Sequence, residues 1–245
     1  MSPKSVDSKE RKGLILTLAI GQYIKTMDPV SSKFLVEECG LDFSSATIRN
    51  VLAELEEEGF LTHPHTSAGR IPTQKGYRFY VDHCLTELKL LEEEKKRIKS
   101  EYDKEKLELE TLLEKTSRVL SDVTHYTSLV SVDGWGNKLF YQGTSFIAGY
   151  PDYQDLNKIK NILSALDEKE RLLKIINREL VQRIEIFIGK ELPCEEINSC
   201  SLVVSQYHTK HGNSGRIAVL GPTRMDYQRV VSALDYFSDL LEEVF

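Results

Sequence analysis

The chain has 245 residues, of which 40% are hydrophobic and 29% charged, as in an ordinary globular protein of one or two domains. Its formal net charge of −6 argues against binding nucleic acid through bulk positive charge, although a small contacting face can still be basic. No apolar run approaches the roughly 18 residues that span a membrane, and the first thirty residues lack a signal-peptide pattern. We therefore expect a cytoplasmic protein without membrane contact.

Two predicted helices precede a tight turn. Apolar residues recur at helical spacing from Glu10 to Thr26, and the pattern stops before Asp28-Pro29. A short helix is predicted from Ser31 to Cys39, and Gly40 marks the turn that follows it.

The third predicted helix begins at Ser44-Ser45, where a serine hydroxyl can accept a bond from a free helix N–H, and it ends at Gly59. Ile48, Leu52 and Leu55 recur at i, i+4 and i+7, the spacing of a buried stripe.

A second stripe on this helix suits the DNA major groove. It consists of two small residues, Ala46 and Ala53, and of Arg49 and Asn50, whose side chains can make paired bonds to guanine and adenine. The glutamates at 54 and 56–58 come only afterwards, where a helix would leave the groove. The alternative interpretation is an ordinary amphipathic helix with a solvated polar face.

A hairpin follows this helix. Phe60-Leu61 can begin a strand, Arg70-Ile71 can form the return strand, and Thr66 to Gly69 make a small polar tip. No acidic residue occurs from Gly59 to Val81. Helix, turn, helix and wing in this order predict a winged helix-turn-helix that binds double-stranded DNA. We expect base reading by Ala46, Arg49, Asn50, Ser45 and Thr47, and phosphate or wing contacts by Lys33, His65, Thr66, Ser67, Arg70 and Lys75.

The DNA-binding domain is predicted to cover residues 1–88, with a last helix capped by Thr73. Residues 89–123 are rich in Glu, Lys and Leu and contain neither Gly nor Pro. Heptads that start at Leu88 place mostly apolar residues at a and d, including Leu91, Ile98 and Leu112. A dimeric coiled coil and a helical connector packed against another domain are both compatible with this pattern.

From Thr127 the hydrophobic period changes to two, and strands alternate with helices, so residues 124–245 are predicted to form an α+β domain. Asp167 and Glu170 have the spacing of a capping pair for the second internal helix. The strands are expected at 128–132, 138–141, 183–188, 202–207 and 216–220, and the helices at 155–166, 169–180 and 224–244.

The sequence offers no catalytic, cofactor or metal motif. Cys194, Cys200, His208 and His211 share a region, but scattered loop and strand positions are the simpler reading of them. The four cysteines form no CxxC pair, so we expect reduced, buried or half-buried thiols. No phosphate loop, GxSxG or HExxH is present. We therefore expect a protein that is not an enzyme and needs no cofactor.

Several runs are similar to a known family. SSATIRN, LEEEGFL, PHTSAGRIPT and KGYRFYVD resemble the amino-terminal domain of the heat-inducible transcription repressor HrcA family, and IGKELP and GPTRMDY resemble its carboxy-terminal domain. The resemblance implies a nucleoid-associated repressor of heat-shock chaperone operons that binds a CIRCE-type inverted repeat as a homodimer. It also implies a GAF-like C-terminal domain and regulation by a GroEL-type chaperonin.

The chain departs from that family in one large feature. Between the YTSLV strand and LFYQG it has only SVDGWGNK, where the family carries further strands and an inserted dimerising segment. We expect a shortened member with a reduced GAF-like sheet. Smaller departures are Met27, Ser31, Lys33 and Val51. The alternative function is a winged-helix repressor of another regulon whose C-terminal domain senses a small molecule or a protein partner.

Overall fold

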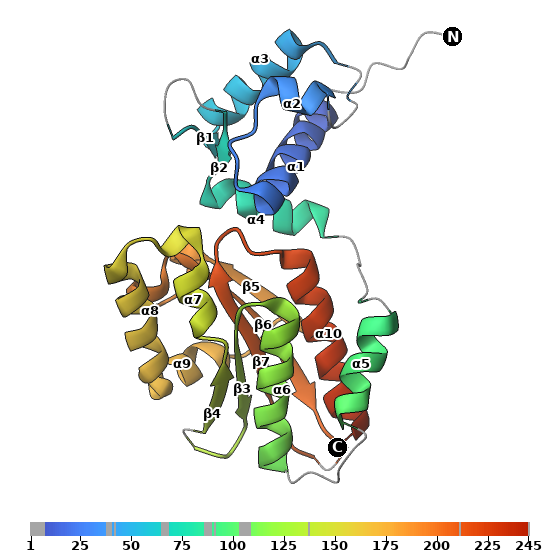
Figure 1. The fold of residues 1–245 in the computed structure, drawn as a ribbon, viewed down its shortest axis with the longest axis vertical. Coiled ribbons are helices and arrows are strands. Elements are labelled where there is room, and N and C mark those ends of the chain that lie inside the picture. Colours follow the sequence, from blue (N-terminus) through green and yellow to red (C-terminus); the bar gives the residue numbers. More distant parts are fainter. Residues whose placement is uncertain are drawn as a thin grey trace. The chain divides into compact units, whose positions relative to one another are not determined.

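The structure is a computed structural model that describes residues 8–37, 41, 43–64, 69–85, 90, 92–102, 109–136, 138–210 and 212–244. The chain divides into two compact units, residues 1–85 and 86–245, and each is considered by itself (Figure 1). Among the described residues, no helix has both the length and the apolar character that crossing a membrane requires.

The first unit consists of helices and one small hairpin. The side chains of Ile15, Ile20, Leu35, Ile48 and Leu52 are almost fully buried and form its core. Its elements are α1 (Ser8–Thr26), α2 (Ser32–Glu37), α3 (Ser45–Glu57), β1 (Leu61–Thr62), β2 (Ile71–Pro72) and α4 (Gln74–Cys84).

The ends of α3 and α4 follow the local sequence signals. The Ser44 hydroxyl accepts a bond from the Thr47 amide at 3.1 Å, and the Thr73 hydroxyl accepts one from the Gly76 amide at 3.2 Å. Gly59 has a φ of +76° beyond the end of α3, a conformation that glycine adopts without steric cost. These capping predictions are confirmed.

Gly69 is required by the way the hairpin joins the rest of the unit. Val30 and Arg70 form an antiparallel bridge, with both backbone N–H···O bonds at 2.9 Å. A Cβ on Gly69 would lie 2.6 Å from the carbonyl carbon and oxygen of Pro29. Any side chain at this position would therefore force the neighbouring backbone to shift.

The second unit is a mixed α+β structure around a five-stranded antiparallel sheet with the order β4-β3-β7-β6-β5. Its strands are β3 (Thr127–Val132), β4 (Leu139–Gln142), β5 (Ile184–Ile188), β6 (Cys200–His208) and β7 (Ser214–Pro222). Its α-helices are α5 (Glu92–Tyr102), α6 (Leu109–Thr124), α7 (Ser145–Gly149), α8 (Leu156–Asp167), α9 (Lys169–Ile176) and α10 (Tyr227–Val244). Short 3-10 turns lie at Pro151–Tyr153, Gly189–Glu191 and Glu195–Ile197.

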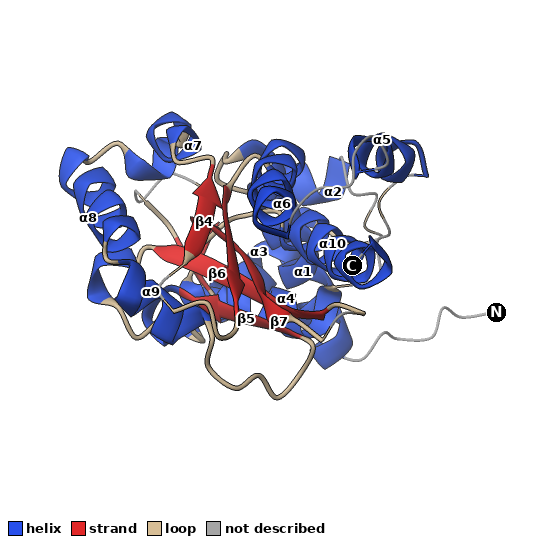
Figure 2. Ribbon diagram, turned by 90° about the horizontal axis from the view of Figure 1, so that it is seen from below, coloured by secondary structure: helices blue, strands red, loops and turns tan. Residues whose placement is uncertain are grey.

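Helices cover both faces of the sheet (Figure 2). Leu202 and Val204 of β6 face the cluster built with α8 and α9, as strand alternation requires. Ser201 and Ser205 point to the opposite face, where their hydroxyls bond Tyr227 and Ser238 of α10, both at 2.8 Å.

Residues 89–123 do not form a separate element. The described part comprises two helices, α5 and α6, which belong to the second unit; Leu91 and residues 103–108 lie outside the described residues. Ile98 and Leu112 are each 1% exposed within one chain. Of the two alternatives, this burial favours the packed connector for these residues.

Other details of the second unit correct the sequence prediction. Asp167 is the last residue of α8, and the N-cap position of α9 is Glu168, which makes no side-chain cap bond, so the capping pair was wrong. Helix α9 ends at Ile176, earlier than expected. The five strands lie where the change to period two placed them, and three cysteines, Cys84, Cys194 and Cys200, are free thiols that are buried or half-buried.

Candidate nucleic-acid interface

The face of α3 opposite the core is open to solvent over its first turns. Ala46, Arg49 and Asn50 are exposed, whereas Ile48 and Leu52 on the other face are 0% and 1% exposed. Within the described residues, the side chains of Arg49 and Asn50 make no hydrogen bond or ion pair. Both groups are therefore available to an external partner.

Ser45 and Thr47, also expected to read bases, are half-buried and already engaged. The Ser45 hydroxyl lies 3.3 Å from that of Ser32 on α2, and the Thr47 hydroxyl lies 2.9 Å from that of Ser44. The first contact links the start of α3 to α2, and the second lies within the first turn of α3.

The acidic end of α3 is tied to α1 by one lysine. The Lys12 Nζ lies 2.8 Å from Glu54 and 2.7 Å from Glu58, two carboxylates one helical turn apart. Its hydrogen bond to Lys12 lowers the pKa of Glu54, and the bonds to Glu54 and Glu58 raise the pKa of Lys12. Lys12 thus offsets part of the negative charge of two glutamates that would repel phosphate.

A third glutamate links α3 to the hairpin. Glu56 accepts a bond from the Arg70 guanidinium at 3.1 Å and contacts the Nδ1 of His63. The Arg70 side chain is 26% exposed, and its Nε has no partner within the described residues. The Arg70 guanidinium is therefore already paired with the Glu56 carboxylate and is not a free cation on the surface of the unit.

The two predicted phosphate-binding lysines lie in different environments. The Lys75 Nζ bonds the Glu58 carbonyl at 2.8 Å and lies 4.3 Å from the Phe60 ring centroid, a C-capping position for α3. Lys33 on α2 is 79% exposed, with Glu37 one turn away at 3.9 Å. His65, Thr66 and Ser67, expected at the wing tip, lie outside the described residues.

Sequence reasoning missed Lys12 and Glu56 as organising residues. The i, i+4 spacing of Glu54 and Glu58 signals a shared cation, but the cation comes from 42 residues earlier and only the tertiary fold brings it there. The role of Glu56 likewise depends on the hairpin folding back on α3.

The second unit holds no converging catalytic group among its described residues. Cys194 donates a bond to Glu196 at 3.2 Å, and Arg171 contacts the same carboxylate at 2.9 Å and holds its pKa at about 2. Burial raises the pKa of Cys194, and it raises that of Cys200 to about 11, which leaves neither thiol activated at neutral pH. His208 bonds Gln206 at 3.0 Å, and no set of three metal-ligating side chains occurs in the described part of the chain.

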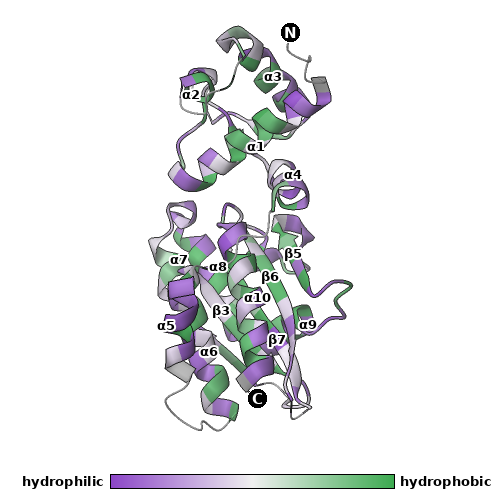
Figure 3. Ribbon diagram, turned by 90° about the vertical axis from the view of Figure 1, so that its right-hand side faces the viewer, coloured by the Kyte–Doolittle hydropathy of each residue, from purple (hydrophilic) through white to green (hydrophobic). Residues whose placement is uncertain are grey.

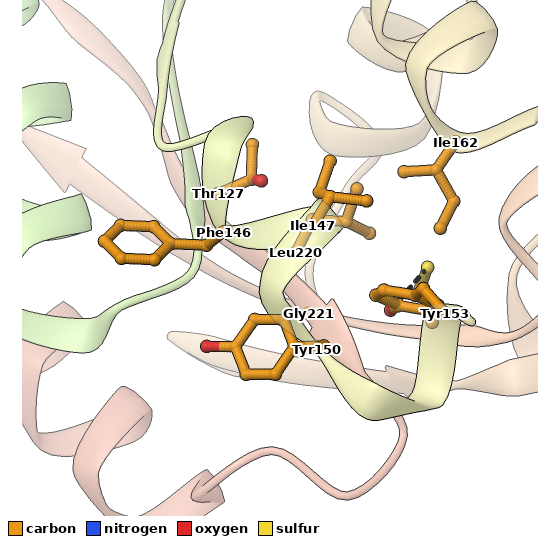
Figure 4. Close-up of a pocket in the computed structure, with 9 residues that line it drawn as sticks. Thr127, Phe146, Ile147, Tyr150, Tyr153, Ile162, Leu220 and Gly221 are labelled. Carbon is orange, nitrogen blue, oxygen red and sulfur yellow. Dashed lines mark hydrogen bonds between the residues drawn. The ribbon is translucent and has the colours of Figure 1, made fainter. Parts of the chain in front are cut away.

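A small enclosed cavity lies between the sheet and α7 (Figure 4). Its volume is about 10 Å³, roughly the space of one water molecule. Its lining is mostly apolar and aromatic and includes Phe146, Ile147, Tyr150 and Tyr153. A cavity of this size does not accommodate a small-molecule effector.

The GPTRMDY run forms the turn from β7 into α10. The Arg224 Nε bonds Asp152 at 2.7 Å, and the Tyr126 hydroxyl accepts a bond from the Asp226 amide at 3.0 Å. These contacts give the run a structural role.

Comparison with known proteins gives a consistent result. The family model described as "HrcA protein C terminal domain" matches residues 132–231. A relative from Geobacter sulfurreducens is 28% identical over 336 residues, covering 97% of this chain and 98% of its own, and one from Bacillus pumilus is 29% identical over 327 residues, covering 93% and 95%. Both are named "Heat-inducible transcription repressor HrcA". These matches support membership of the chain in the HrcA family.

The chain is shorter than these two relatives. The alignment to the Geobacter protein runs over 336 positions, whereas this chain has 245 residues, so that relative contains segments without a counterpart here. A crystal structure titled as a hypothetical protein at 2.2 Å resolution shares the fold, with a TM-score of 0.74 and 19% identity over 96% of this chain and 98% of its own.

Proposed function

We propose that this HrcA-family chain is a sequence-specific DNA-binding repressor of heat-shock chaperone operons and that its first unit is a winged helix-turn-helix. The observation that carries the proposal is the exposed face of α3 formed by Ala46, Arg49 and Asn50. Contacts of Glu54 with Lys12 and of Glu56 with Arg70 hold this helix in the unit. The names of the relatives support the repressor assignment.

The chemistry of this face suits base recognition. The Arg49 guanidinium can donate two bonds to guanine O6 and N7, and the Asn50 amide can bond adenine N6 and N7. Ala46 leaves space for the helix to lie against the groove. Three of the four acids at the other end are paired with Lys12, Arg70 or His63, which lowers their repulsion of phosphate.

We propose that only one of the three basic residues expected to contact phosphate, Lys33, does so, and that Arg70 and Lys75 have positioning roles. Lys33 is exposed and holds a phosphate as a point charge. Arg70 and Lys75 position α3 and the hairpin, because their charged groups already bond Glu56 and the Glu58 carbonyl. Ser45 and Thr47 position the start of α3, and the phosphate contacts of His65, Thr66 and Ser67 stay predictions.

We further propose that the protein acts as a homodimer on a CIRCE-type inverted repeat, with a GroEL-type chaperonin as its regulator. One winged helix contacts too few base pairs to select a promoter among competing genomic sites. Two DNA-binding domains related by two-fold symmetry would double the number of base pairs that are recognised. The apolar stripes of α6 and α10 are buried within the chain, so a dimer uses other surfaces.

Anisotropy of a labelled duplex tests the proposal. Protein is titrated onto an inverted repeat taken from upstream of a chaperonin gene, onto the same repeat with one half-site scrambled, and onto a fully scrambled duplex. We expect the intact repeat to bind at least tenfold more tightly than either control, with a two-to-one complex in sedimentation velocity. Equal affinity for all three duplexes would contradict the assignment.

A further inference from the structure

A groove in the second unit has no role in the function proposed above. It lies between α5 and α6, with Arg229 of α10 in its lining, and has a volume of about 610 Å³. Its basic side chains are Arg97, Lys115, Arg118, His125 and Arg229, and its acids are Glu94 and Asp122. Figure 3 shows α5 as a predominantly hydrophilic helix.

The groove is locally basic although the chain carries a net charge of −6. Glu94 forms an ion pair with Arg229 at 3.3 Å. The Arg229 guanidinium also donates a hydrogen bond to the Val123 carbonyl at 2.9 Å. The exposed guanidiniums of Arg97 and Arg118 have no hydrogen bond or ion pair within the described residues. Two arginines from neighbouring helices, without a partner in the described part of the chain, therefore line one groove.

The groove is also partly apolar. Its accessible apolar patch is Val119, which is half-buried, since Ile98 and Val123 in the same lining are only 1% and 2% exposed. Guanidinium groups match carboxylates in geometry, and an apolar patch between them favours side chains of similar character. We propose that this groove docks an acidic peptide segment of a protein partner, with carboxylates on Arg97 and Arg118 and an apolar side chain on the patch.

The same features disfavour nucleic acid as the occupant. A phosphate backbone has no apolar group to place on Val119, and Asp122 in the lining repels closely spaced phosphates. An acidic peptide can place its carboxylates away from Asp122 and its apolar residues on the patch. Charge and hydrophobicity together therefore favour a peptide.

Docking in this groove would stabilise α5, the first helix that the structure describes in the second unit. Three polar contacts link this helix to α10: the Tyr236 hydroxyl to the Lys95 carbonyl at 3.0 Å, Lys99 to Glu243 at 2.9 Å, and Arg229 to Glu94. An occupant that bridges Arg97 and Arg118 adds a connection between α5 and α6. Slower hydrogen exchange in both helices is the expected signature.

The test uses the full chain and a fluorescein-labelled twelve-residue peptide of alternating Glu-Glu-Leu units, with a Lys-Lys-Leu twin as the charge control. We expect saturable binding of the acidic peptide only, and roughly tenfold weaker binding after the double change Arg97→Glu, Arg118→Glu. The matched control is Lys158→Glu, Lys160→Glu, which reverses two exposed charges on α8 and should leave binding unchanged.

Two further measurements distinguish an acidic peptide from nucleic acid or phosphate as the ligand of this groove. Val119→Asp should weaken the acidic peptide, because it places a charge in the apolar patch, and circular dichroism melting checks that each variant is folded. Equal peptide affinity for the wild-type chain and the Arg97→Glu, Arg118→Glu variant would overturn the proposal. Displacement of the peptide by a non-specific DNA duplex or by pyrophosphate would also overturn it. This competition is measured in the Arg49→Ala variant, so that DNA binding at the exposed face of α3 is weakened.

Discussion

The role of α6 can be tested at Leu112. Its side chain is 1% exposed and lies on the helix that covers β3 and β4. A fully buried leucine changed to alanine costs about 3 kcal/mol, from a range of roughly 2–5 kcal/mol, because the transfer free energy is lost and a cavity remains. If α6 is a packed core helix, Leu112→Ala lowers the stability of the second unit and leaves the oligomeric state unchanged.

The magnitude can be converted to a melting temperature. For a domain of this size each kcal/mol shifts Tm by about 2–4 °C, so the expected decrease is roughly 6–12 °C. Differential scanning calorimetry measures the transition of the second unit, and sedimentation velocity measures the oligomer. Glu114→Ala, an exposed position on the same helix, is the matched control and should change stability by less than about 0.5 kcal/mol. An unchanged Tm together with dissociation of a dimer would refute the packed connector and restore the coiled coil.

Three further predictions concern single contacts. Gly69→Ala should destabilise the first unit by about 1–3 kcal/mol in denaturant titration, because its Cβ meets backbone at 2.6 Å, whereas Gly149→Ala has open space and should be neutral. Lys12→Met should raise the pKa of Glu54 in NMR titration and weaken DNA binding a few-fold at low salt, less at high salt; an unchanged salt dependence would contradict the pairing. Arg171→Gln should raise the pKa of Glu196 from about 2 toward 4.5. Because the folded-state pKa is depressed, its stabilising effect is present above pH 4.5 and is lost as pH falls toward 2, a loss that the variant should not show.

The sequence predicted those features that depend on local chemistry. The caps at Ser44 and Thr73, the stop at Gly59 and the positions of the five strands follow from short-range patterns, and the structure has them. The buried and exposed stripes of α3 were also readable, since helical periodicity fixes which residues share a face.

Features that depend on tertiary contacts were not readable. A heptad-like pattern does not say whether an apolar seam meets a second chain or the same chain, and Ile98 and Leu112 meet the same chain. The partners of Arg70 and Lys75 come from elements that only the fold brings together, so a free phosphate-binding cation could not be told from a paired one. Asp167 failed as a cap because α8 extends through it.

The most direct test of the central claim measures operator discrimination by Arg49→Ala. Affinities are determined for an inverted repeat and for a panel in which each base pair of one half-site is changed in turn. We expect the variant to lose roughly 1–3 kcal/mol of discrimination at one or two guanine positions. Lys33→Ala should instead weaken every duplex in parallel and reduce the salt slope by about one. Full discrimination retained by Arg49→Ala across the panel would contradict the assignment of α3 as the reading helix.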